Sequence, residues 1–388
     1  MVFKQVPAQC SSSISREQAQ LLLDQQANSY KEILDFMSLQ GLHRIAAKKR
    51  VRNDYASINR LPNEIISNIM ELALVELISI SSFYYLQNLC VLTGISSRWR
   101  DVAIESPRLW AYLSSANTPE LNEILLKRSK NAPLRVSVEY AMHNDTTLRA
   151  FVENVLTQAH RIKNFYYQDS PQRLTQLQGL FSVPAPSLET FEIDPEEPKY
   201  RAHSLLALHL VEQTQEVMPQ LFAAQAPNLK TLRLMQVSVP WDSSIFGPIL
   251  TCLVLGNQPH GVWPTMETWM NVLCRCNNLE ELSISNFGII PVPTVPDIPM
   301  VQLPYLSYMM ARGIQHNIIT NMISLIKVNN FERIVIVLDL TGVIEDDQTL
   351  SAIFPSAAPS SLSALLANSM ETLEILPDRQ ITYSNNQN

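Results

Sequence analysis

One segment, residues 61–110, decides how this chain folds. It begins with Leu61-Pro62-Asn63-Glu64-Ile65-Ile66 and closes with Ser97-Arg98-Trp99-Arg100-Asp101-Val102-Ala103 and Pro107-Arg108-Leu109-Trp110. Pro62 suits the first turn of a helix, where its missing N–H has no acceptor, and Glu64 favours the positive end of the helix dipole. The sequence therefore predicts that a helix starts at Leu61.

The segment contains two further helix signals. The first helix carries apolar residues at three- and four-residue steps, namely Ile65, Ile66, Ile69, Leu72 and Ala73. A second apolar group follows, namely Leu86, Leu89, Val91 and Leu92. Gly94 then breaks the pattern, and Ser96 or Ser97 can cap a third helix that contains Trp99, Val102 and Ala103, with Trp99 and Val102 expected in the core. So small a unit buries little surface, which predicts a permanent partner or docking onto the rest of the chain.

The chain before this segment, residues 1–57, is predicted to be helical or partly disordered. Residues 16–52 are compatible with one or two helices. Lys48-Lys49-Arg50-Val51-Arg52 is either a nuclear import signal or the solvated end of a helix, and charges beside the carbonyl end of a helix favour the second interpretation.

A different pattern, apolar-x-x-apolar-x-apolar, recurs beyond Ser114. Its seven copies are Ile162-Phe165-Tyr167, Leu188-Phe191-Ile193, Leu229-Leu232-Leu234, Leu250-Leu253-Leu255, Leu279-Leu282-Ile284, Phe331-Ile334-Ile336 and Met370-Leu373-Ile375, and Leu306-Met309 fits a degraded copy. Alternating apolar residues indicate a strand with one buried face, while segments such as 205–225 and 263–276 have helical spacing. The fold class predicted for residues 114–376 is therefore α/β, an irregular solenoid with a parallel sheet. We expect the Pro-rich segment 291–299 to be a loop and residues 377–388 a polar tail.

Composition excludes several classes of function. A formal net charge of -7 gives no general basic surface for nucleic acid, so a protein partner is favoured. Only nine glycines are present, with no phosphate-binding fingerprint, and the five cysteines form no C-x-x-C pair. We find neither a signal peptide nor a membrane-spanning stretch, which predicts a soluble chain of the cytoplasm or nucleus.

Catalytic patterns are also missing. There is no G-x-S-x-G or H-E-x-x-H motif, and the seven histidines are scattered. The sequence therefore predicts a protein that is not an enzyme and that holds no metal or cofactor.

The motif L-P-x-E-I-I-x-x-I, followed by I-S-S-R-W-R-D-V-A and P-R-L-W, resembles an F-box in the form abundant in mushroom-forming fungi. Residues 125–138 are similar to the segment that follows the F-box in those proteins. Ser96 departs from that pattern, which often has cysteine there, and the first connection between helices is long. The repeats are similar to leucine-rich repeats, but the usual asparagine is replaced by Glu196, Val237, Gln258 and Phe287, so we expect irregular curvature and missing backbone ladders.

The resemblance implies a substrate-recognition adaptor of a cullin-type (SCF) ubiquitin ligase. Residues 58–113 would form the F-box, with Leu61 and Pro62 contacting a Skp-type adaptor. Six further residues would be shared between that contact and the internal core: Ile65, Ile66, Ile69, Leu89, Leu92 and Ile95. The polar face of the sheet would bind the protein to be ubiquitinated, through Tyr166, Glu192, Asp194, Arg233, Met235, Glu281 and Ser283.

Two alternatives remain open at this point. The repeats could be a protein-interaction scaffold unconnected to ubiquitination, with the three helices as an N-terminal cap that buries Leu61 and Pro62. A hydrolase hidden in the repeat domain would instead require a clefted cluster of carboxylate and histidine with a shifted pKa.

Overall fold

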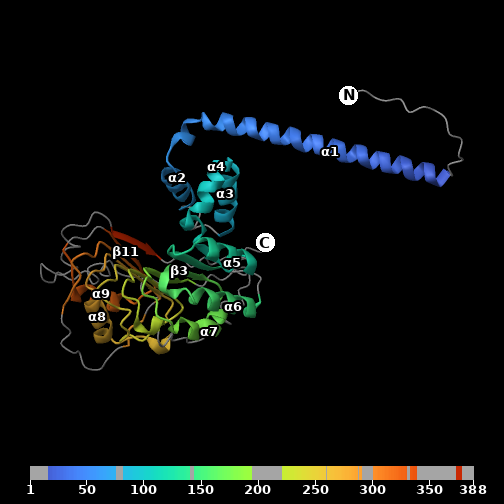
Figure 1. The fold of residues 1–388 in the computed structure, drawn as a ribbon. Helices are drawn as coiled ribbons and strands as arrows, with labels where there is room; N and C mark the ends of the chain where they lie inside the picture. Colours follow the sequence, from blue (N-terminus) through green and yellow to red (C-terminus); the bar gives the residue numbers. More distant parts are fainter. Residues whose placement is uncertain are drawn as a thin grey trace, which may run out of the picture. The chain divides into compact units, whose positions relative to one another are not determined.

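The structure is a computed structural model that describes residues 16–75, 82–139, 144–194, 221–258, 260–286, 288–290, 300–329, 333–338 and 373–377. The chain divides into two compact units, residues 1–70 with 90–103, and residues 71–89 with 104–388 (Figure 1). The contiguous F-box-like domain predicted over residues 58–113 is therefore shared between the two units. Residues 378–388 of the predicted tail, the Pro-rich loop and most of the helical segment 205–225 lie outside the described residues, and Pro377, the first residue of that tail, belongs to a strand instead.

The first unit is helical. It contains α1 (Arg16–Asp54), the short 3-10 helix η1 (Ser57–Arg60), most of α2 (Asn63–Val75), the end of α3 (Ser82–Gly94) and most of α4 (Ser97–Glu105). The basic run 48–52 lies in the last turns of α1, which is one helix where the sequence allowed one or two. Trp99 and Val102 of α4 are buried, as predicted, and Ala103 is buried as well.

The second unit is built on a ten-stranded sheet in which every neighbouring pair is parallel. Its strands, in spatial order, are β1 (Tyr112–Ser114), β2 (Leu134–Glu139), β3 (Ile162–Gln168), β4 (Thr190–Ile193), β5 (Thr231–Met235), β6 (Cys252–Gly256), β7 (Glu281–Ser285), β9 (Tyr308–Arg312), β11 (Arg333–Leu338) and β12 (Leu373–Pro377). Spatial order follows chain order. We call each strand of this sheet, together with the segment that connects it to the next strand, one turn. The fold is therefore mixed α/β with a parallel sheet, as predicted.

Helices cover one face of this sheet (Figure 1). They are α5 (Pro119–Arg128), α6 (Asp145–Leu156), α7 (Pro171–Leu177), α8 (Met266–Arg275) and α9 (His316–Leu325). Side chains such as Leu125 of α5, Val152 of α6 and Trp269 of α8 join the strand residues in one hydrophobic core. Two short strands, β8 (Val301–Gln302) and β10 (Ile326–Lys327), pair separately.

The repeated apolar motif marks strands. The second and third positions of all seven copies lie on β3, β4, β5, β6, β7, β11 and β12, and the degraded copy lies at β9. On β3 to β7 these side chains are almost fully buried. The sheet nevertheless begins two strands before the first copy, and β1 lies largely inside the stretch assigned to the helical domain.

Backbone hydrogen bonds join successive turns beside the start of each strand. Amide-to-carbonyl bonds of 2.8–3.0 Å run from Glu189 to Lys163, Lys230 to Glu189, Thr251 to Lys230, Glu280 to Thr251 and Ser307 to Glu280. At the opposite strand ends, the buried amide Nε2 of Gln258 donates to the carbonyl oxygens of Val237 (2.8 Å) and Leu234 (3.1 Å). The ladders expected to be missing lie beyond the strand ends, at the positions of Glu196, Val237, Gln258 and Phe287. Glu196 and Phe287 lie outside the described residues, and at Gln258 a side-chain amide bridges to the preceding turn although it is not an asparagine.

Candidate protein-interaction surfaces

The start of α2 is fixed in place by α4 in the first unit. The guanidinium of Arg98 donates to the carbonyl oxygen of Leu61 and, at 3.1 Å, to Oδ1 of Asn63, and the indole N–H of Trp99 donates to Oδ1 of Asn59 at 3.0 Å. The hydroxyl of Ser96 accepts the Trp99 amide N–H at 3.2 Å, so Ser96 caps α4. Residues 59–63 are therefore held by polar contacts, while the side chain of Pro62 stays exposed.

The eight residues predicted to bind an adaptor divide by exposure. Pro62, Ile65 (43% exposed) and Ile95 (50% exposed) are open to solvent. Leu61, Ile69 and Leu92 are half-buried. Ile66 and Leu89 were expected to contribute both to the adaptor contact and to the internal core. Both are fully buried, so this structure permits only the second role, internal packing.

Val91 was predicted as part of an apolar group but is exposed. Ile95 lies beyond Gly94, the last residue of α3, so helical spacing does not place Val91 and Ile95 on one side of a helix. No spacing in the sequence therefore indicates that Val91 belongs to the candidate surface.

The residues predicted to bind a substrate lie on the face of the sheet opposite the covering helices. Strand pairing places Tyr166, Glu192, Arg233 and Ser283 on one row across the strands. Asp194 and Met235 follow at the next outward position, and Glu281 lies on the row before. All but one are half-buried. Ser283, whose register partners are Val254 and Met310, is only 3% exposed, which corrects its assignment as a contact residue.

Some charged side chains on this face form ion pairs with one another. Arg233 donates from Nε and Nη2 to Oδ2 of Asp194, at 2.9 and 2.8 Å. Burial raises the pKa of the Glu192 carboxyl, although the charge of Arg233 opposes the rise. Burial also raises the pKa of the Cys252 thiol to about 12, and neighbouring Glu281 adds to the effect. The face is therefore neither apolar nor freely hydrated.

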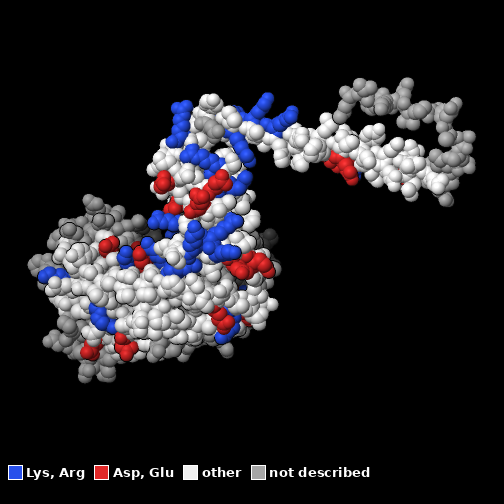
Figure 2. All heavy atoms as spheres, in the orientation of Figure 1, with Lys and Arg blue, Asp and Glu red and all other residues white. Residues whose placement is uncertain are grey.

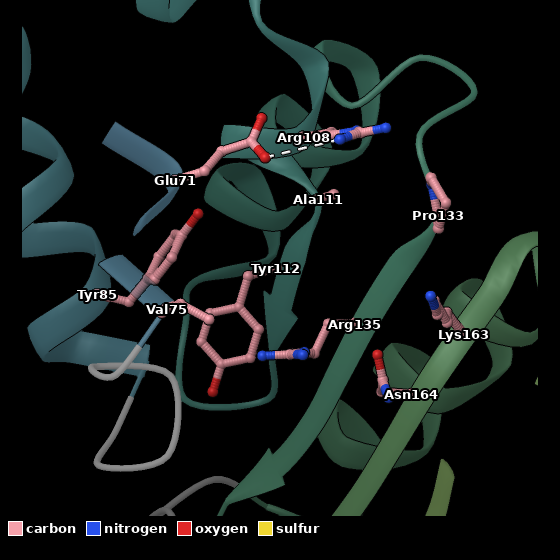
Figure 3. Close-up of a pocket in the computed structure, with 10 residues that line it drawn as sticks. All are labelled: Glu71, Val75, Tyr85, Arg108, Ala111, Tyr112, Pro133, Arg135, Lys163 and Asn164. Carbon is pink, nitrogen blue, oxygen red and sulfur yellow. Dashed lines mark ion pairs between the residues drawn. The ribbon is translucent and has the colours of Figure 1, made fainter. Parts of the chain in front are cut away.

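A cavity of about 400 Å³ lies in the second unit, where α2, α3 and the first strands of the sheet meet. Its charged lining residues are Glu71, Arg108, Arg135 and Lys163, and Tyr85 and Tyr112 form aromatic walls (Figure 3). Sequence reasoning missed this cavity, because its residues come from separate segments that only the fold brings together.

No known family model matches the chain, and no curated protein matches it significantly. Among the described residues, no helix is long and apolar enough to span a bilayer. Within that same part of the chain, no group of three or more histidine, cysteine or acidic side chains is arranged to hold a metal ion.

Proposed function

We propose that the chain is a substrate-recognition adaptor of a cullin-type ubiquitin ligase. Residues 58–113 would act as an F-box that docks on a Skp-type adaptor, and the sheet would bind the protein to be ubiquitinated. Catalysis would reside in other subunits. The contribution of this chain would be proximity, since holding two proteins together raises the effective concentration of a target lysine near the ubiquitin carrier.

One observation carries the proposal. Ile66 and Trp99 are buried, whereas Pro62, Ile65 and Ile95 of the same small unit stay exposed. Burial of apolar surface is the main favourable term in protein association, so these side chains suit the core of an interface. They belong to the segment that carries the F-box-like motif.

The second unit supports the other half of the proposal. A parallel sheet whose strand order follows the chain, with backbone ladders between turns, is typical of leucine-rich-repeat-like solenoids. Solenoids of this kind present an extended strand face to protein partners. We propose the predicted residues other than Ser283 as its contact set.

The test is co-purification of the full chain with a Skp-type adaptor. The double variant Leu61→Ala/Pro62→Ala and the single variants Ile65→Asp and Ile95→Asp should each weaken retention about tenfold or more, as expected for residues at the centre of an interface. Ile124→Asp is the matched control, because Ile124 is similarly exposed (47%) but lies on α5 of the other unit. Circular dichroism should show that every variant keeps its helical content.

Two results would refute the proposal. The native chain could ignore every Skp-type adaptor offered, which would favour the alternative of a scaffold unconnected to ubiquitination. The adaptor could also be retained equally by the variants and the native chain, which would place its contact elsewhere.

A further inference from the structure

The lining of the cavity is cationic although the chain as a whole is acidic. The formal net charge is -7, yet Arg108, Arg135 and Lys163 line the cavity against one carboxylate, Glu71. Figure 3 shows the Glu71–Arg108 pair on one side of the hollow and Arg135 with Lys163 on the other. Figure 2 shows further Lys and Arg side chains over neighbouring α5, whose last turn carries Lys127 and Arg128.

These cations are weakly neutralised. Arg108 lies 3.8 Å from Glu71 and its side chain is 73% exposed, and Lys163 lies 3.2 Å from Glu189 at the surface. Exposed ion pairs of this kind contribute roughly 0–1 kcal/mol, so they yield readily to a competing anion. Arg135 has no side-chain hydrogen bond or ion pair with any described residue, which leaves its planar fork of donors open.

The walls around Arg135 are aromatic and fixed. The rings of Tyr85 and Tyr112 meet edge to face with centroids 5.2 Å apart. Their hydroxyls are already used, since Tyr85 donates to the carbonyl oxygen of Leu109 (3.0 Å) and Tyr112 to Oε1 of Glu139 (3.3 Å). Burial raises the pKa of both phenols, and the charge of Arg135 opposes the rise in each case. The guanidinium therefore faces neutral rings in a medium that screens charge less than water does.

The cavity continues into the exposed face of the sheet. Arg135 of β2 and Asn164 of β3 are register partners, and their row continues through Thr190, Thr231 and Cys252 to Glu281. Its volume of about 400 Å³ exceeds that of a lone inorganic anion and falls in the range of pockets that hold small organic molecules, so it has room for an amino-acid side chain. A peptide lying along the sheet face could thus place one side chain in the cavity.

We propose that this cavity binds an anionic side chain, a carboxylate or a phosphate, presented by a protein partner, with Arg135 as the principal ligand and Lys163 as the second cation. In the context of the proposed function, on which the identity of the partner rests, that side chain belongs to the protein to be ubiquitinated. Arg135 is suited to either anion because its donors match two oxygens at once.

The experiment uses the full chain and three capped tripeptides that carry phosphoserine, glutamate or serine between two glycines. Binding is followed by saturation-transfer NMR with increasing peptide and at two salt concentrations. We expect the two anionic peptides to bind, more weakly at higher salt, and the serine peptide not to bind. Arg135→Gln should lower the affinity about tenfold or more, and Lys163→Gln should lower it less.

Two variants serve as controls. Arg135→Lys keeps the charge without the planar fork and should retain part of the affinity. Lys230→Gln removes a cation that also pairs with Glu189, at 3.4 Å, but lies outside the cavity lining, so its affinity should equal that of the native chain. Urea unfolding of each variant establishes that it is folded.

The peptides also distinguish the two sources of charge. Tighter binding of phosphoserine would mean that the partner is recognised after phosphorylation, whereas equal binding would mean that an acidic sequence suffices. Equal binding of all three peptides, no binding of either anionic peptide, or equal losses in Arg135→Gln and Lys230→Gln would each overturn the proposal. Retention of the Skp-type adaptor, measured on the same variants, reports separately on the function proposed above.

Discussion

Substitution of Gln258 tests how much its side-chain hydrogen bonds to the preceding turn contribute to the stability of the sheet. Its side chain is only 3% exposed, and Nε2 donates to the carbonyl oxygens of Val237 and Leu234, with a longer contact of 3.4 Å to that of Gly256. Among the described residues, Oε1 has no hydrogen-bond partner. Gln258→Glu keeps the shape of the side chain but directs a carboxylate oxygen at those carbonyl oxygens.

The magnitude follows from these contacts. Loss of the two shorter hydrogen bonds costs about 1–3 kcal/mol at about 0.5–1.5 kcal/mol each. Gln258→Leu should lose about that much. Gln258→Glu should lose about 3 kcal/mol or more near neutral pH, because a buried carboxylate without a donor adds a desolvation penalty of several kcal/mol.

The assay is urea unfolding followed by tryptophan fluorescence, since the indole N–H of Trp263 donates to the carbonyl oxygen of Gln258 and reports on this region. Burial without a donor raises the folded-state pKa of the new carboxyl above its unfolded value of about 4.3. The variant therefore approaches the stability of Gln258→Leu below that value and loses stability as pH rises toward the folded pKa. A glutamate variant as stable as the native chain at pH 7.5, or a deficit that does not change with pH, would refute this account of Gln258.

Two further predictions concern the cysteines and the helical unit. Burial raises the pKa of the Cys252 and Cys276 thiols to about 12, so iodoacetamide at pH 8 should modify exposed Cys90 and Cys274 first, as mass spectrometry of digests would reveal; equal rates at Cys276 would contradict this. Replacement of buried Trp99 by alanine should lower the free energy of unfolding by about 3–5 kcal/mol, measured by urea titration, and Trp99→Phe should cost less.

The strands were predictable because their signal is local. The motif apolar-x-x-apolar-x-apolar places two buried residues two positions apart and a further apolar residue three positions before them. This pattern alone identifies β3 to β7, without knowledge of any partner strand. β2 was not predicted by this motif because Pro133 occupies the first apolar position, three residues before Val136 and five before Val138. β1 escaped because its three residues are all buried and show no alternation.

The candidate sites were less predictable because exposure depends on neighbours that sequence spacing does not encode. Ser283 lies between the buried residues Leu282 and Ile284, as a solvent-facing residue of a strand should, but it is itself buried between the neighbouring strands. The cationic cavity combines Arg108, Arg135 and Lys163 from three separate segments. Only the parallel pairing of β1, β2 and β3 brings those segments together.

The way in which the sheet is held would suit its exposed face to the recognition role proposed above. The inward-facing residues of the strands form the core. The hydrogen bonds beside the strand starts join main-chain N–H and C=O groups, and every residue except proline has both groups. Outward residues such as Glu192 and Arg233 contribute little to either. Arg233 is half-exposed and pairs with Asp194, and ion pairs of this kind contribute roughly 0–1 kcal/mol. The outward rows can therefore differ in charge and shape while the turns keep their register, which is the property that a recognition surface requires.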